Sequence, residues 1–74
     1  MSRQEVQYKL AFSISEFCEL HDISRAHFYN IIKTGGGPRM MDVGGRKVIS
    51  REAAADWRRE REAATAATQV TVSA

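Results

Sequence analysis

The stretch Ser24–Lys33, which reads SRAHFYNIIK, carries most of the side chains that could recognise a ligand. Arginine can form two hydrogen bonds with guanine O6 and N7, and asparagine can do the same with adenine N6 and N7. Histidine, tyrosine and lysine can reach bases or phosphates. The side chains of these types are Arg25, His27, Tyr29, Asn30 and Lys33. Together they predict contact with a nucleic acid; the plainer alternative is a solvated helix face.

Two further residues of this stretch suit a DNA groove. Ala26 is small, so a helix could approach closely at that point when it enters a major groove about 12 Å wide. Ser24 stands where the helix is expected to begin, and the free backbone N–H groups there can bind a phosphate. We therefore expect Ser24 and Ala26 to belong to the same contact surface.

A second pair of cations, Arg46 and Lys47, follows Gly44-Gly45. One interpretation is a charged turn that keeps an edge strand soluble. The other is a hairpin tip whose cations contact phosphates or the minor groove beside the helix. We favour the second interpretation. Arg39 and Arg51 are expected to be flanking phosphate contacts.

The charge of the chain is concentrated in its middle. Residues 24–51 hold six cations and one aspartate, a net charge of +5, although the whole chain carries only +2. Residues 1–23 carry −2 and residues 52–74 carry −1. A clustered basic segment indicates a polyanionic partner.

The other reactive groups do not form a catalytic or metal-binding pattern. Cys18 and His21 have C-x-x-H spacing and His27 follows, but a structural zinc site needs four ligands and the chain has one cysteine. A buried, inert Cys18 is the favoured interpretation. Because the sequence also lacks a Gly-x-Ser-x-Gly motif and a phosphate-binding loop, we expect no enzyme, no metal and no cofactor.

Cysteine content and hydropathy bear on location. A single cysteine cannot form an internal disulfide, which agrees with a reducing cytoplasm. No segment approaches the roughly 18 consecutive apolar residues of a membrane helix, and the N-terminus lacks an apolar signal core. We expect a cytoplasmic protein without membrane contact.

Two short helices are predicted to position the contact residues. Ser13–Glu16 fits the S-x-x-E capping box at a helix start. The helix of about eight residues that follows has an apolar stripe made of Ile14, Phe17, Cys18, Leu20 and His21. Asp22 tolerates the left-handed conformation that breaks a helix.

The second helix is predicted over Arg25–Lys33 and capped by Ser24. Phe28, Ile31 and Ile32 are expected to face inward together with Ile23. The few residues between the helices match helix-turn-helix spacing.

Glycine and proline residues mark the expected helix end and turn in the rest of the chain. Gly35–Pro38 ends the second helix. Residues 39–43 and 46–49 are predicted strands around the Gly44-Gly45 turn. Ser50 is predicted to cap a third helix from Arg51 to about Glu62, whose inward face carries Ala53, Ala54 and Trp57.

These elements predict a small α+β fold, a winged helix-turn-helix. Its order is helix-turn-helix, two-stranded β-hairpin wing, helix. Residues 1–11 are an N-terminal lead-in, and the segment Tyr8–Phe12 is extended or a short strand. Residues 12–62 are the DNA-binding domain, and residues 63–74 are expected to be a frayed helix end and a flexible tail.

The ordered motifs resemble the excisionase and AlpA-like winged helix-turn-helix family, which is related to MerR-type DNA-binding domains. The similar pieces are SISEFCELHDIS, SRAHFYNIIK, the Gly-Pro before the first hairpin strand, VGGRKVIS and REAAADW, over about two-thirds of the chain. The sequence departs from the family pattern in having Asp22 where the turn usually has glycine, three glycines before Pro38, and only two cations at the hairpin tip.

The resemblance implies a DNA-binding protein of a phage, a mobile element or a bacterial chromosome, associated with the nucleoid. It implies an excisionase-type recombination directionality factor that binds and bends attachment-site DNA, with a site-specific recombinase (integrase) as a further partner. The alternatives are an AlpA-like transcriptional regulator with the same surface and a protein-interaction module.

A lone domain with so short a recognition helix should read few base pairs. We therefore expect further copies of the protein on adjacent sites, or a partner, to supply specificity. With five or six phosphate contacts, a plot of the logarithm of the binding constant against the logarithm of the salt concentration would have a slope of about −5.

Overall fold

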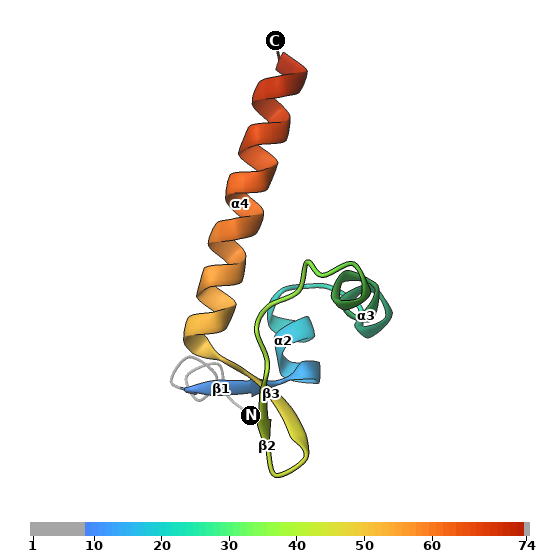
Figure 1. The fold of residues 1–74 in the computed structure, drawn as a ribbon, viewed down its shortest axis with the longest axis vertical. Helices are drawn as coiled ribbons and strands as arrows, with labels where there is room; N and C mark the ends of the chain where they lie inside the picture. The colour runs from blue at the N-terminus through green and yellow to red at the C-terminus, as the bar shows by residue number, and fades with distance from the viewer. Residues whose placement is uncertain (1–8, 74) are drawn as a thin grey trace.

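Six elements form the described part of the chain, which in this computed structural model is residues 9–73, with side chains described up to residue 68 (Figure 1). Their order is β1 (Ala11–Ser13), α2 (Ile14–Leu20), α3 (Arg25–Lys33), β2 (Met41–Val43), β3 (Arg46–Ser50) and α4 (Arg51–Ser73). The described residues thus form a small α+β fold of three helices and a three-stranded antiparallel sheet.

The start of α2 is fixed by the predicted capping box. The Ser13 hydroxyl accepts a hydrogen bond from the Glu16 N–H at 3.1 Å, and the Glu16 carboxylate accepts one from the Ser13 N–H at 3.0 Å. Lys9 also donates to Glu16. The Lys9 hydrogen bond, and then the Ser13 amide, lower the pKa of Glu16.

Asp22 ends α2 in the left-handed conformation, with φ of 57°. Its N–H bonds to the Glu19 carbonyl and the Ile23 N–H bonds to the Cys18 carbonyl, a pattern that closes the last turn of the helix. Ser24 then caps α3, because its hydroxyl accepts from the His27 N–H at 3.0 Å. The predicted bounds of α3 and both predicted caps are confirmed.

Two of the three glycines after α3, Gly35 and Gly37, have a structural reason to lack a side chain. Gly35 has φ of 81°, and its N–H bonds to the Ile32 carbonyl at the helix end. The Gly36 carbonyl accepts a hydrogen bond from the Trp57 indole at 2.7 Å. Gly37 lies so close to Ile32 that a Cβ atom there would overlap its side chain.

The sheet has the strand order β1-β3-β2, so β3 is central. Gly44 and Gly45 both have positive φ, as a primed turn between β2 and β3 requires. Strand β2 begins at Met41, two residues after the predicted start, because Arg39 and Met40 lie outside the ladder. The N-terminal strand is Ala11–Ser13; Tyr8, where the prediction began, lies outside the described residues.

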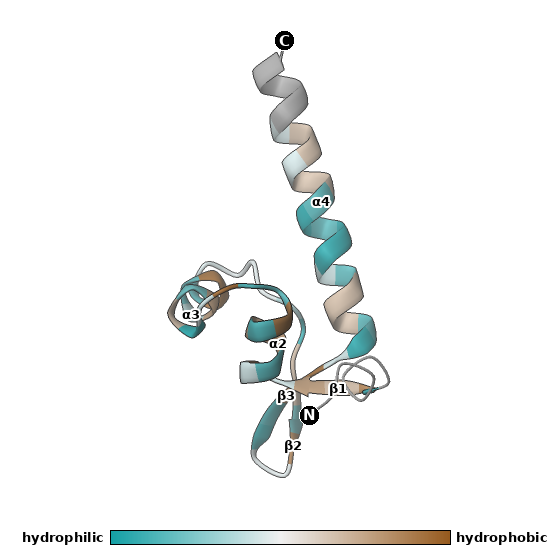
Figure 2. Ribbon diagram, turned by 180° about the vertical axis from the view of Figure 1, so that it is seen from behind, coloured by the Kyte–Doolittle hydropathy of each residue, from teal (hydrophilic) through white to brown (hydrophobic). Residues whose placement is uncertain are grey.

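Helix α4 is much longer than predicted. The Ser50 hydroxyl caps it by accepting from the Ala53 N–H at 3.0 Å. The predicted end near Glu62 is wrong, because the helix continues to Ser73 and projects away from the sheet (Figures 1 and 2). The alanine-rich segment after Glu62 has no apolar period, but alanine is the strongest helix former.

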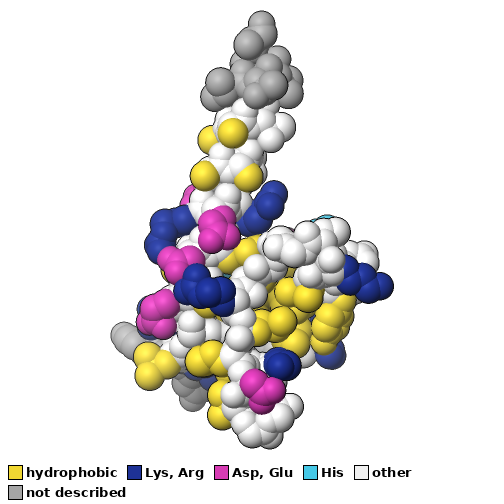
Figure 3. Space-filling view, viewed as in Figure 1, with side chains coloured by type: hydrophobic (Ala, Val, Ile, Leu, Met, Phe, Trp, Pro, Cys, Tyr) yellow, Lys and Arg dark blue, Asp and Glu magenta, His cyan; other side chains and the backbone are white. Residues whose placement is uncertain are grey.

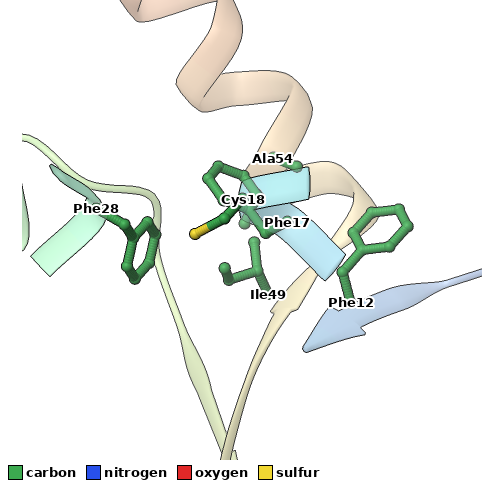
Figure 4. Packing of buried hydrophobic residues seen from close by; sticks show 7 residues of the cluster. Phe12, Phe17, Cys18, Phe28, Ile49 and Ala54 are labelled. Atoms are coloured by element: carbon green, nitrogen blue, oxygen red, sulfur yellow. The ribbon is translucent and has the colours of Figure 1, made fainter. Parts of the chain in front are cut away.

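The core lies between the helices and one face of the sheet. Among the residues whose side chains are described, it consists of seven buried ones, namely Phe12, Phe17, Cys18, Phe28, Ile49, Ala53 and Ala54. Figure 4 shows Phe17, Cys18 and Ile49 in the middle of this cluster, between Phe12 and Phe28. Leu20, predicted to widen the apolar stripe of α2, is instead 48% exposed.

None of the helices in the described residues is both long enough and apolar enough to cross a membrane.

Candidate nucleic-acid interface

The outward side of α3 is open to solvent. All six predicted contact residues on it are exposed, namely Arg25, Ala26, His27, Tyr29, Asn30 and Lys33. We call these six residues the α3 surface. The inward residue Phe28 is fully buried, which holds the helix in one rotational setting on the core. The last helix therefore does not cover the α3 surface.

Helical spacing divides the α3 surface into three rows. Arg25, Tyr29 and Lys33 follow one another at four-residue intervals and form one row. Ala26 and Asn30 form the row beside it, where the small Ala26 leaves room for a close approach. His27 lies on the opposite flank, next to α4.

Tyr29 is held by an aromatic contact. Its ring packs edge-on against Phe28, with a centroid distance of 5.6 Å and an interplanar angle of 78°. The side chain is still 44% exposed. Tyr29 is therefore half-exposed on the α3 surface while its ring contacts the core residue Phe28.

The first turn of α3 offers backbone donors. The first N–H groups of a helix have no partner inside the helix. Ser24 satisfies the N–H of His27, and no hydrogen bond within the described residues engages the N–H groups of Arg25 and Ala26. Two amides beside an exposed Arg25 suit a phosphate.

The two cations at the ribbon tip differ in their surroundings. We call Met41–Ser50 the β2–β3 ribbon. Lys47 donates a hydrogen bond to Asp42 at 3.1 Å, whereas Arg46 makes no ion pair with any described residue. Figure 3 shows an acidic and a basic side chain in contact on this ribbon. The hydrogen bond from Lys47, followed by that from the Gly45 N–H, lowers the pKa of Asp42.

Arg39 is tied to the last helix. Its guanidinium donates to the Asp56 carboxylate at 2.8 Å, and Arg59 pairs with the same carboxylate. The hydrogen bond from Arg39 is the main reason why the pKa of Asp56 is lowered. Arg39, which was predicted to contact a phosphate, is therefore already paired with Asp56, 17 positions further along the chain.

A groove between α3 and α4 was not predicted. Its volume is about 450 Å³. The lining residues are Ile23, His27, Ile31, Thr34, Gly36, Trp57 and Arg61. Ile31, predicted to face the core, is partly buried and lines this groove. The four-residue spacing of Trp57 and Arg61 on α4 was the only sequence signal for it.

Cys18 is buried in the fold, and His21 is hydrogen-bonded within it. Cys18 is buried, and burial raises the pKa of its thiol. The His21 ring donates from Nδ1 to the Phe17 carbonyl at 2.8 Å and accepts at Nε2 from Arg58 at 3.1 Å. Within the described residues, no three His, Cys, Asp or Glu side chains are grouped so that they could hold a metal ion.

Comparison of the chain with protein-family models, curated proteins and solved structures found no match. The similarity to the excisionase and AlpA-like family therefore stays a prediction from the motifs.

Proposed function

We propose that the protein binds double-stranded DNA, with the α3 surface in the major groove and the β2–β3 ribbon against the backbone alongside. The observation that carries this proposal is the separation of the two sides of α3. Phe28 is fully buried, while all six residues of the α3 surface are exposed. An exposed helix face bearing Arg, Asn and Lys around a small residue has the groups that read base edges and phosphates.

Each group has a natural role in such a complex. Arg25 and Asn30 have the hydrogen-bonding geometry for guanine and adenine. Lys33 and the Tyr29 hydroxyl, in the same row as Arg25, suit the phosphate backbone. The open amides at the start of α3 suit a further phosphate. The ribbon cations Arg46 and Lys47 suit the backbone or the minor groove, and of the two only Lys47 is paired with a carboxylate among the described residues.

Two biological roles use this surface. We propose binding and bending of attachment-site DNA, as in an excisionase-type directionality factor, with transcriptional regulation as the alternative. Gel mobility of fragments carrying the binding site at different positions separates them. A position-dependent mobility, which reports a bend, favours the first role, and uniform mobility favours the second.

The DNA-binding proposal is tested by fluorescence anisotropy with a labelled duplex from the region around the gene. We expect R25Q/K33Q to weaken binding at low salt at least about tenfold and to reduce the salt slope by about two, because two phosphate or base contacts are lost. The matched control is R59Q/R61Q, which removes the same charge from α4. Equal loss in both variants, or no binding by the wild-type protein, would contradict the proposal.

A protein-interaction role is the second candidate, favoured by the projecting part of α4. Every described residue from Glu62 to Thr68 is exposed, so this segment adds no side chain to the core. We propose a second copy of the chain as its partner. Sedimentation equilibrium should show a dimer that A63E/A66E dissociates; a monomer at all concentrations would refute this role.

A further inference from the structure

The two cations of the β2–β3 ribbon lie on opposite faces of the sheet, because successive side chains of a strand alternate. Lys47 is two residues from Ile49 in β3, so these two share a face. Ile49 pairs with Phe12, and both are buried in the core that the helices cover. Lys47 is therefore the ribbon cation on the same side of the sheet as α3, and Arg46 is on the other side.

Asp42 lies directly opposite Lys47 in the β2–β3 ladder. Its Oδ2 accepts a hydrogen bond from Lys47 Nζ at 3.1 Å, and its Oδ1 accepts one from the Gly45 N–H at 2.9 Å. The carboxylate is thus held by two donors, one of them in the turn itself. Asp42 is the only acidic residue between positions 24 and 51.

The other cations near this side are not paired in this way. Arg25 and Lys33 make no ion pair with any described residue. A phosphate that approaches Lys47 must compete with Asp42 for the ammonium group. It also meets the negative charge of the carboxylate, which opposes it at close range.

We infer that Asp42 limits the affinity of the protein for DNA by holding Lys47 and by repelling the phosphate backbone at the ribbon. This inference rests on the proposed DNA binding and adds a residue that sets its strength. Without the carboxylate charge, Lys47 becomes a free cation on the side of α3, and the ribbon gains one phosphate contact.

The test is the affinity of D42N for a labelled duplex over a series of salt concentrations. The asparagine side-chain oxygen can still accept from the Gly45 N–H, so the turn keeps its hydrogen bond. We expect D42N to bind about three- to fivefold more tightly at low salt, with a log–log slope steeper by about 0.9 for one added phosphate contact. D42S, whose hydroxyl can also accept from Gly45, is a second variant with the same expected direction.

Two controls separate this effect from a general change of charge. E60Q removes one negative charge from an exposed position of α4 and should leave the affinity nearly unchanged. In D42N/K47Q the gain should disappear, because the released cation is gone. K47Q alone should weaken binding, because it leaves the Asp42 carboxylate without its counter-charge beside the duplex.

Each outcome has one meaning. Tighter binding by D42N or D42S that depends on Lys47 supports the inference. A gain no larger than that of E60Q, or one that persists in D42N/K47Q, overturns it while wild-type DNA binding stands. If neither the wild-type protein nor any variant binds a duplex at low salt, the proposed function itself fails and the inference fails with it.

Discussion

Asp22 shows at the scale of a single residue how the turn between α2 and α3 is set. Its φ of 57° lies in the left-handed region, which costs a residue with a Cβ atom about 1–2 kcal/mol. Aspartate tolerates this conformation better than most residues, and a β-branched residue tolerates it poorly. The turn therefore accepts aspartate, whereas the pattern of the excisionase and AlpA-like family usually has glycine there.

The first prediction concerns this turn. We expect D22G to keep or slightly raise the free energy of unfolding, because glycine adopts positive φ without steric cost. D22V should lower it by about 1–2 kcal/mol. Urea unfolding followed by Trp57 fluorescence measures both. Equal stability of D22G and D22V would show that residue 22 does not need the left-handed conformation.

Glu16 makes the free energy of unfolding depend on pH. Lys9 and the capping amide lower its folded pKa, so the ionised form is favoured in the folded state. Its contribution to stability is fully present above the ordinary pKa of a glutamate, about 4.3, and is lost as the pH falls through the lower folded pKa. The lowered pKa values of Asp42 and Asp56 act in the same direction.

The second prediction is that E16Q weakens the acid sensitivity of the fold. The wild-type protein should lose stability between neutral pH and the acid range below the ordinary glutamate pKa. E16Q should be less stable at neutral pH and should lose less on acidification, because residue 16 no longer titrates. Urea unfolding at a series of pH values measures this difference. An unchanged pH profile in E16Q would contradict the role of the carboxylate.

At the scale of elements, the sequence was sufficient to predict the helix caps and the hairpin turn, which depend on neighbouring residues. The capping box at Ser13, the Ser24 cap and the Gly44-Gly45 turn depend on residues no more than three positions apart, so the sequence pattern contained them. The rotational setting of α3 followed from the spacing of Phe28 and the other apolar residues.

Contacts between distant residues were not predictable in this way. The pairing of β1 with β3 joins Phe12 to Ile49, and the Trp57 indole reaches Gly36 across 21 positions. The groove between α3 and α4 depends on how the two helices approach each other. The pairing of Arg39 with Asp56 likewise needs the packing of the loop after α3 against α4.

The part of α4 after Glu62 was not predicted from the pattern of apolar residues. Periodicity reports the packing of one face, and the described residues from Glu62 to Thr68 are exposed and lie outside the core. The helical state of this segment depends on intrinsic propensity, and within it the Thr65 and Thr68 hydroxyls donate to the carbonyls of Arg61 and Ala64. The stability of this segment should therefore be separable from that of the core.

The third prediction is that A63G/A66G reduces helix content without loosening the core. Each glycine costs about 1 kcal/mol in a helix interior relative to alanine. Circular dichroism at 222 nm should weaken, while unfolding reported by Trp57 should keep its midpoint. The matched pair A53G/A54G, in the buried first turns of α4, should lower that midpoint. Unchanged dichroism in A63G/A66G would contradict a helix that extends past Glu62.

At the scale of the whole molecule, some elements form the core and others carry the predicted contact residues. The sheet and the first turns of α4 form the platform, and Phe28 fixes α3 upon it. The predicted contact residues then lie on one exposed helix face and at the tip of the ribbon. The basic central segment thus becomes two cationic regions, the α3 surface and the ribbon tip. Two of the cations of this segment are held by carboxylates, Lys47 by Asp42 on the ribbon and Arg39 by Asp56 on α4.

The most direct test of DNA binding by the α3 surface is a ¹H–¹⁵N NMR titration of the protein with a duplex from the region around its gene. We expect the amide shifts to be concentrated in Ser24–Lys33 and around the Gly44-Gly45 turn, and to weaken as salt is added. Shifts confined to α4, or no shifts at low salt, would contradict it.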